Sequence, residues 1–177
     1  MKELGTQAPD FELRDVVTGN AVSRHDVAGP KGMLVMFICR HCPFVKHVQD
    51  ELAKIGRDYA GRGVGIVAIS ANDVASHPED SPTKLAYQAL ELQFTFPYLF
   101  DESQDVARAY DAQCTPDFFL YDARGKLVYR GQLDNSRPGN DIPVTGLDLR
   151  AALDAVIAGR PVSSEQRPAI GCNIKWR

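Results

Sequence analysis

Residues 33–43, with the sequence MLVMFICRHCP, decide the fold of this chain. The apolar run from Met33 to Ile38 follows turn residues, and a continuous run of this length is typical of a strand buried on both faces. Two cysteines, Cys39 and Cys42, come directly after the run. Pro43 is tolerated in the first turn of a helix, where its missing N–H has no partner. The stretch therefore predicts a buried strand followed by a helix, with two thiols at the junction.

The segments around this junction fit one α/β domain. Apolar residues recur at three- and four-residue steps after Pro43, which predicts an amphipathic helix ending near Gly61. Residues 64–70 form a second buried strand, and the order strand, helix, strand implies a right-handed parallel crossover. We expect a domain over residues 1–160 and a C-terminal tail, residues 161–177, packed on or near it. The other expected elements are strands at 8–17, 21–23, 97–100, 118–121 and 127–129, and helices at 82–92, 104–110 and 147–158.

The composition is that of an ordinary globular protein. Of the 177 residues, 44% are hydrophobic and 24% are charged, which excludes disorder for most of the chain. A net charge of -3 with scattered basic residues gives no indication of nucleic-acid binding. The longest apolar run is too short to span a bilayer, and Met1–Gly5 lacks the apolar core of a signal peptide. We therefore expect a cytoplasmic protein whose partner is neither a nucleic acid nor a membrane.

The paired cysteines predict redox chemistry. In a reducing compartment a CxxC motif is better explained by catalysis or metal binding than by architecture. A helix N-terminus favours a thiolate, so we predict Cys39 as the attacking nucleophile and Cys42 as the more buried resolving thiol. His41 would stabilise the Cys39 thiolate. The motif thus predicts a thiol-disulfide oxidoreductase that needs no dissociable cofactor, with a protein or small thiol as substrate and a reductant protein as electron donor.

Metal binding is the main alternative for this motif. A complete zinc site needs four ligands, commonly from a second CxxC or a pair of histidines. No such partner pair occurs in the sequence, although a composite site of Cys39 and Cys42 with His47 or Cys114 stays open. A third hypothesis is an interaction module that uses neither cysteine.

A second informative stretch is Cys114-Thr115-Pro116, which precedes the strand expected at 118–121. On the residues alone, Pro116 is a trans proline that opens an edge strand, a position where proline is tolerated. Only bonds before proline adopt the cis form at low cost.

Several segments together resemble a known family. They are APDFEL at 8–13, FICRHCPFV at 37–45, CTPDFFL at 114–120, DNSRPGND at 134–141 and IGCNIKW at 170–176. The chain resembles thioredoxin-like proteins of the peroxiredoxin-related redoxin branch, which includes the alkyl hydroperoxide reductase and thiol-specific antioxidant type. The resemblance implies a thioredoxin-like α/β fold with a central mixed sheet flanked by helices and an N-terminal β-hairpin. It also implies that Pro116 is cis and that Thr115 and Pro116 form a substrate platform facing the CxxC motif.

The chain also departs from its relatives. Peroxiredoxins place a threonine three residues before the reactive cysteine. This chain has Met36 three residues before Cys39, and Cys39 three residues before Cys42, so neither position supplies the threonine hydroxyl. Peroxide reduction is therefore kept only as an alternative function. Thioredoxins carry a buried aspartate in the strand before the motif. Residues 33–38 contain no acid, so a water or an Asp or Glu from elsewhere would have to act as the base.

Two further thiols are candidates for redox chemistry. The resemblance places Cys114 close to the CxxC motif, as a third redox thiol or a small buried residue. If the tail folds back, Cys172 could pair with Cys114 or resolve an oxidised Cys39. Otherwise it is a packed thiol in a tail anchored by its apolar neighbours.

Overall fold

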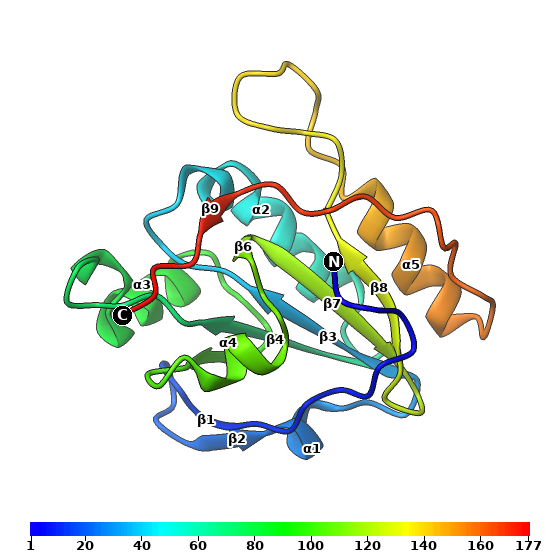
Figure 1. Ribbon diagram of the computed structural model, residues 1–177, viewed down its shortest axis with the longest axis horizontal. Coiled ribbons are helices and arrows are strands. Elements are labelled where there is room, and N and C mark those ends of the chain that lie inside the picture. Colours follow the sequence, from blue (N-terminus) through cyan, green and yellow to red (C-terminus); the bar gives the residue numbers. More distant parts are fainter.

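A seven-stranded mixed sheet forms the centre of the molecule in the computed structural model, which describes residues 1–177 (Figure 1). The strand order is β2-β1-β5-β4-β3-β7-β8. At its centre, β3 (Gly32–Phe37) runs parallel to β4 (Val64–Ser70) and antiparallel to β7 (Asp117–Asp122). The other strands of this sheet are β1 (Glu12–Asp15), β2 (Ala21–Ser23), β5 (Tyr98–Phe100) and β8 (Leu127–Gly131).

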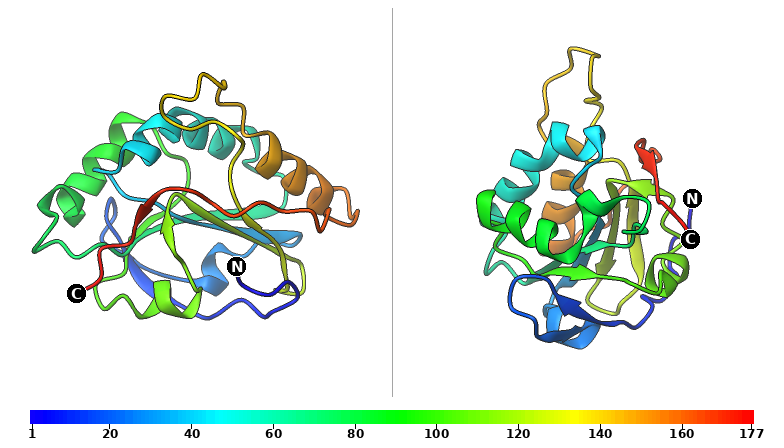
Figure 2. Two further views of the ribbon diagram at one scale, coloured as in Figure 1. Left: turned by 45° about the horizontal axis from the view of Figure 1, so that its top comes forward. Right: turned by 90° about the vertical axis from the view of Figure 1, so that its left-hand side faces the viewer.

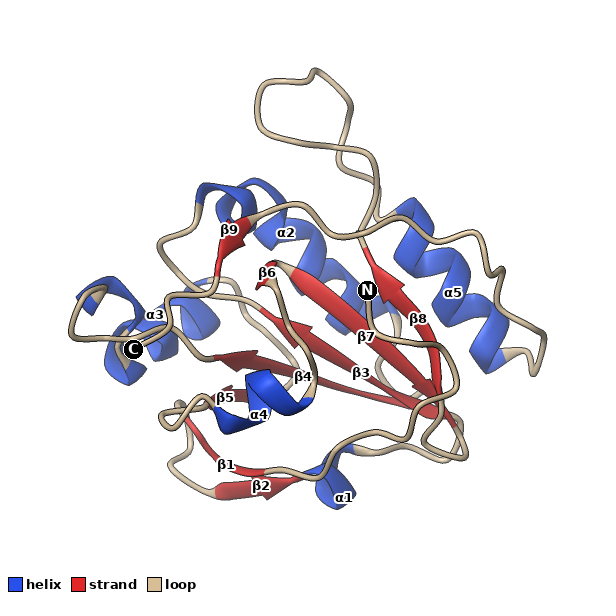
Figure 3. Cartoon of the chain, viewed as in Figure 1, coloured by secondary structure: helices blue, strands red, loops and turns tan.

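Helices cover both faces of the sheet (Figures 2 and 3). One hydrophobic cluster joins α2 (Pro43–Asp58), α3 (Pro82–Glu91) and α5 (Leu147–Ile157) to the sheet, and a second lies against α4 (Asp105–Ala109). The remaining helical segments are α1 (Arg24–Val27) and the 3₁₀ turn η1 (Pro78–Asp80). No helix is long and apolar enough to cross a membrane.

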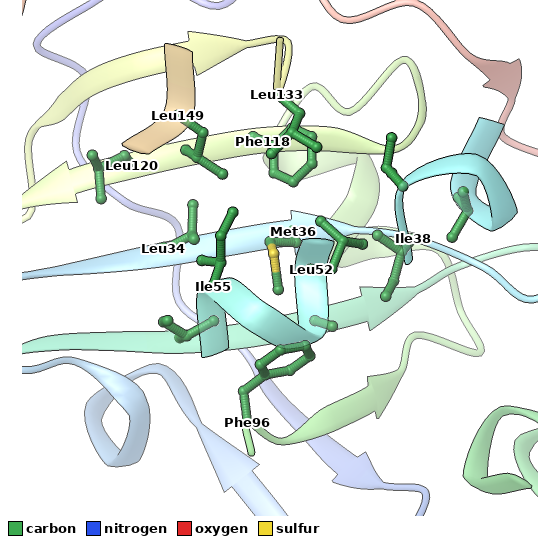
Figure 4. Close-up of a cluster of buried hydrophobic side chains, with 14 of the residues drawn as sticks. Leu34, Met36, Ile38, Leu52, Ile55, Phe96, Phe118, Leu120, Leu133 and Leu149 are labelled. Atoms are coloured by element: carbon green, nitrogen blue, oxygen red, sulfur yellow. The ribbon is translucent and has the colours of Figure 1, made fainter. Parts of the chain in front are cut away.

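Strand β3 is buried on both faces, as its continuous apolar run predicted. Leu34, Met36 and Ile38 point into the cluster beneath α2 and α5 (Figure 4), whereas the alternate residues Met33 and Val35 point into the other cluster. Each fully buried aliphatic side chain contributes about 1.5–3 kcal/mol relative to exposure. The strand therefore holds the two halves of the core together and fixes the position of the cysteines at its C-terminal end.

Most other elements occur where the sequence predicts them. The N-terminal hairpin is present as the antiparallel pair β1–β2, in which Glu12 lies opposite Ser23. Helices α3, α4 and α5 lie within the ranges expected for them. The short segments α1 and η1 were not expected, because four- and three-residue turns are too short to show a helical period.

The C-terminal tail is more ordered than the sequence predicts. It contains β9 (Cys172–Asn173), which pairs antiparallel with β6 (Cys114–Thr115) in a separate two-stranded sheet (Figure 1). The Arg167 carbonyl accepts a hydrogen bond from the Gln132 amide at 3.0 Å, so the tail is also fixed beside β8. The sequence predicts no strand in the tail, because two residues cannot show a strand period.

Candidate active site

The start of α2 decides which cysteine lies at the helix N-terminus. The helix begins at Pro43, and Cys42 is its N-cap residue with an extended backbone. Cys39 lies three residues earlier, just beyond the end of β3. The sequence predicts that the helix N-terminus acts on Cys39, whereas the structure places Cys42 there. The partial positive charge of the N-terminus acts on Cys42.

The two sulfurs are fully buried and have opposite electrostatic surroundings. Both cysteines are 0% exposed, and all four cysteines of the chain are free thiols. The hydrogen bond between the pair, together with contacts from Cys172 and Thr115, lowers the pKa of Cys42 well below its ordinary value. The same hydrogen bond, burial and the nearby charge of Asp80 raise the pKa of Cys39. The start of α2 and these contacts favour the thiolate on Cys42, whereas the role of Cys39 as the attacking thiol stays a prediction.

A buried carboxylate lies on the Cys39 side of the motif. Asp80 is 0% exposed and comes from η1, 40 residues beyond Arg40. Its oxygens accept hydrogen bonds from the backbone amides of Arg40 at 2.8 Å and His41 at 3.1 Å, and from the Asn72 side chain at 3.0 Å. Asp80 thus fixes the two residues between the cysteines. It is also an acid from outside the strand, of the kind that the sequence required.

His41 lies beside Cys39, and its ring is held by a second partner. Its Nδ1 is paired with the Asp80 carboxylate, and its ring stacks on that of His77 with centroids 4.8 Å apart. Ligand atoms of Cys39, His41 and Asp80 all lie within 4.8 Å of one another, which makes them a candidate metal-binding cluster. The composite metal site considered from the sequence does not form with His47, because His47 Nε2 lies 2.7 Å from Ser136 Oγ.

Two buried polar side chains support the backbone of Cys39. Gln88 of α3 donates a hydrogen bond from Nε2 to the Cys39 carbonyl at 3.2 Å. The hydroxyl of Tyr98 in turn donates to Gln88 Oε1 at 2.9 Å. Neither residue has a signal in the sequence, since each acts only through contacts between distant segments.

The Thr115–Pro116 segment faces both cysteines. The peptide bond is cis, as the resemblance implied and as the residues alone did not. Thr115 Oγ1 lies 3.4 Å from Cys39 Sγ, and the Thr115 carbonyl oxygen lies 3.5 Å from Cys42 Sγ. These contacts place Thr115 directly over the dithiol, where the predicted substrate platform should be.

The sulfur of Cys114 packs against the platform segment. It lies 3.7 Å from the Pro116 carbonyl oxygen. Burial, with the nearby charge of Asp117, raises the pKa of Cys114 to about 12. Cys114 is therefore a protonated, packed thiol at neutral pH, and a redox role for it stays a prediction.

A small pocket opens beside the platform. Its lining includes Phe44, Pro116 and Ile170 of the tail, together with Arg137 of the segment between β8 and α5 that projects from the body (Figure 2). The Arg137 guanidinium donates to Gln132 Oε1 at 2.6 Å, which holds it at the pocket wall. The pocket therefore adjoins the platform at Pro116 and the first turn of α2 at Phe44.

Comparisons with known proteins agree with this architecture. The model of the AhpC/TSA family matches residues 4–130. A crystal structure of an uncharacterized conserved protein from Geobacillus kaustophilus is 56% identical, covers 100% of this chain and 94% of that chain, and has a TM-score of 0.98. The thiol-disulfide oxidoreductase ResA of Halalkalibacterium halodurans is 27% identical over 70% of this chain. The match spans 65% of the length of that relative, slightly less than two thirds.

A more distantly related solved structure has a similar fold. The thioredoxin domain of a thiol-disulfide oxidoreductase from Bacteroides vulgatus is 26% identical, covers 73% of this chain and 89% of that chain, and has a TM-score of 0.60. The chain therefore has a thioredoxin-like α/β fold with a central mixed sheet, which confirms the fold that the resemblance implied.

Proposed function

Because this chain belongs to the AhpC/TSA family, we propose that it is a thiol-disulfide oxidoreductase that works through Cys39 and Cys42. The observation that carries the proposal is a buried dithiol at the start of α2 that faces Thr115 and the cis-Pro116 bond, with Thr115 atoms 3.4 Å from Cys39 Sγ and 3.5 Å from Cys42 Sγ. A curated relative with the name thiol-disulfide oxidoreductase supports the same reaction class. The substrate is a protein or small-molecule disulfide, and a reductant protein returns the electrons.

The reaction begins at Cys42. Its thiolate attacks one sulfur of a substrate disulfide, which forms a mixed disulfide on Cys42 and releases the other half of the substrate as a thiolate. Cys39 then loses its proton and attacks Cys42 Sγ. This second step forms the Cys39–Cys42 disulfide and releases the remaining substrate thiolate, so that two electrons have passed from the dithiol to the substrate.

Asp80 is the base proposed for the second step. Its carboxylate lies within 4.8 Å of Cys39 Sγ in the cluster with His41. A carboxylate there makes a resting Cys39 thiolate unfavourable, which keeps Cys39 protonated until Cys42 has reacted. Once the mixed disulfide has removed the negative charge from Cys42, the proton can move from Cys39 to the Asp80 and His41 pair.

The first experiment is a redox titration of the reduced protein in glutathione buffers of graded potential. We expect the Cys39–Cys42 disulfide to form with a two-electron midpoint, as read by peptide mass mapping. Cys39→Ser should still release glutathione thiol when it meets glutathione disulfide, whereas Cys42→Ser should release none. If the two cysteines stay unlinked at every potential, the proposal fails. Release of thiol by Cys42→Ser would instead reverse the assigned roles.

Metal binding is the second candidate, favoured by the cluster of Cys39, His41 and Asp80. These residue types suit zinc, although a structural zinc site normally has a fourth ligand. A metal protein would retain stoichiometric zinc or copper after purification and lose it in Cys39→Ser. Metal analysis of the wild-type protein and that variant separates the two functions.

A further inference from the structure

The chain occupies its own substrate platform. Strand β6, which ends next to Pro116, presents its edge to β9 of the tail, and the two pair in antiparallel register (Figure 1). An exposed strand edge has free N–H and C=O groups that pair with any extended segment. Here the extended segment is Cys172–Asn173, so the tail lies where an incoming peptide would pair.

The register directs Cys172 toward the dithiol. Residues directly opposite each other in an antiparallel pair carry their side chains on the same face. Cys172 lies opposite Thr115, whose hydroxyl is 3.4 Å from Cys39 Sγ. Cys172 accordingly packs against the hydrophobic cluster that contains both Cys39 and Cys42. Cys114 lies opposite Asn173, on the alternate face of the same pair.

Close contacts on both sides hold Cys172 in this position. A Cβ atom on Gly171 would lie 2.0 Å from the Thr115 carbonyl oxygen, so only glycine allows so close an approach. After Cys172, Ile174 is 3% exposed, and the Lys175 amide donates to Asn72 Oδ1 at 2.8 Å. The Lys175 carbonyl accepts from the Asp73 amide at 2.8 Å. The tail thus delivers a thiol to the site as a bound peptide would.

We propose that Cys172 is a third redox thiol that exchanges with the active-site disulfide, an inference that rests on the proposed function. Cys172 loses its proton and attacks Cys42 Sγ of the Cys39–Cys42 disulfide. A Cys42–Cys172 bond forms, the Cys39–Cys42 bond breaks, and Cys39 leaves and takes up a proton, so that one thiol replaces another. The exchange consumes no electrons, because one disulfide and one thiol are present before and after. In this second oxidised form, the tail is covalently tied across the platform.

The same geometry makes Cys172 an alternative resolving thiol. When Cys42 carries a mixed disulfide with a small thiol, Cys172 can attack Cys42 Sγ in place of Cys39 and release the small thiol. Because the tail holds Cys172 opposite Thr115, beside the dithiol, the reaction is intramolecular and should exceed the rate with free thiol by on the order of 10²-fold or more.

The sequence allows a direct test by peptide mapping. Trypsin places each of the four cysteines in a separate peptide, with Cys39 in 32–40, Cys42 in 41–46, Cys114 in 109–124 and Cys172 in 151–175. The wild-type protein is oxidised with glutathione disulfide, quenched in acid and digested without reduction. We expect linked peptides 32–40 with 41–46, and in addition 41–46 with 151–175.

Variants then isolate the exchange. In Cys39→Ser, glutathione disulfide should yield mainly the Cys42–Cys172 link, and the glutathione adduct on Cys42 should be short-lived. In Cys39→Ser with Cys172→Ser, the adduct should persist on the order of 10²-fold longer. The matched control, Cys39→Ser with Cys114→Ser, should behave as Cys39→Ser alone, since Cys114 lies on the other face of β6.

The outcomes separate this inference from the function on which it rests. If the adduct on Cys42 persists equally with and without Cys172, and no link between 41–46 and 151–175 forms in the wild-type protein, the third thiol is refuted while the oxidoreductase stands. If Cys42 forms neither an adduct nor a link in any protein, the proposed function itself fails. The wild-type mapping needs no substitution, so the test does not depend on how well a variant folds.

Discussion

The two cysteines of the motif are three residues apart and meet opposite surroundings. On the Cys39 side, the neighbours are the buried carboxylate of Asp80 and the amide of Gln88, both fixed by hydrogen bonds. On the Cys42 side, the neighbours are the start of α2 and the thiol of Cys172. One side opposes a negative charge on sulfur and the other side stabilises it. The chemical difference between two identical side chains therefore comes from the fold around them.

The contrast also explains why the two cysteines carry out different steps of the proposed reaction. A thiolate is required for attack on an incoming disulfide, whereas the second thiol must stay protonated until the mixed disulfide has formed. A helix N-terminus supplies the first condition and a buried carboxylate supplies the second. Four predictions test this contrast, in order of decreasing expected effect.

The largest effect is expected in the pH dependence of alkylation. Because the pKa of Cys42 is lowered, its thiolate persists as the pH falls, and its rate of reaction with iodoacetamide should change little between pH 8.5 and pH 6. An ordinary cysteine with a pKa near 8.5 loses reactivity on the order of 10²-fold over this interval. Tryptic mapping reads each cysteine separately. Equal pH profiles for Cys42 and the unfolded chain would remove the contrast between the two sides.

Replacing the carboxylate tests the Cys39 side. Asp80→Asn removes the charge that opposes the Cys39 thiolate and the proposed base, so resolution of the mixed disulfide should slow on the order of 10²-fold. The initial attack by Cys42 should keep its rate, and the alkylation profile of Cys39 should move to lower pH. The lost hydrogen bonding costs about 1–3 kcal/mol of stability. Stopped-flow release of a coloured thiol separates the two steps.

The matched control for Asp80→Asn is Glu79→Gln, at the neighbouring acid that pairs with Arg40 and Lys84 on the surface. Glu79→Gln should leave unchanged the rate of attack by Cys42, the rate of resolution by Cys39 and the pH profile of Cys39 alkylation. If Glu79→Gln slows resolution as much as Asp80→Asn does, the effect belongs to η1 as a whole and Asp80 has no special role.

A smaller effect is expected at the tail on the Cys42 side. Gly171→Ala forces a methyl group against the Thr115 carbonyl, which should cost about 1–3 kcal/mol of stability and displace β9 from β6. Amide hydrogen exchange should then be faster at residues 172–175, with the core strands unchanged. Ser164→Ala, at an exposed tail position, is the control. Unchanged exchange in Gly171→Ala would show that the tail adapts without leaving the platform.

The smallest effect concerns Asp117, directly after the platform. Burial raises the pKa of Asp117 to about 7. A carboxyl whose pKa is higher in the folded state stabilises the fold below its unfolded pKa near 4, and that contribution is lost as the pH rises through about 7. Asp117→Asn should therefore raise Tm relative to wild type by a few degrees, roughly 2–4 °C, at pH 8 and by less at pH 5. Asp50→Asn, at an exposed acid, should show no such trend.

The part of the fold with a clear sequence period could be predicted. Strand β3 and helix α2 were expected, because an apolar run and a regular helical pattern reflect burial directly. The helix start near Pro43 was also expected, but the thiol at the helix N-terminus was taken to be Cys39, three residues before Cys42, since cysteine is not among the usual N-cap residues. That small difference changed which thiol lies at the helix N-terminus and hence the assignment of the nucleophile.

The polar half of the site could not be predicted in detail. Asp80 and Gln88 reach the motif only through tertiary contacts, and nothing near them in the sequence marks a catalytic role. The sequence indicated only that an acid from elsewhere was needed. Strand β9 was also missed, because its pairing depends on the shape of the Gly171 contact and not on a local pattern.

The closeness of Gly171 to Thr115 has a consequence for how ligands should be sought. A segment joined to the same chain competes for the platform at an effective concentration on the order of millimolar. Free peptides that cannot displace the tail at this effective concentration will give no signal in a titration with the intact chain, even if they fit the platform well. Compact disulfides that need no strand pairing are not subject to this competition, so a screen on the whole protein will favour them.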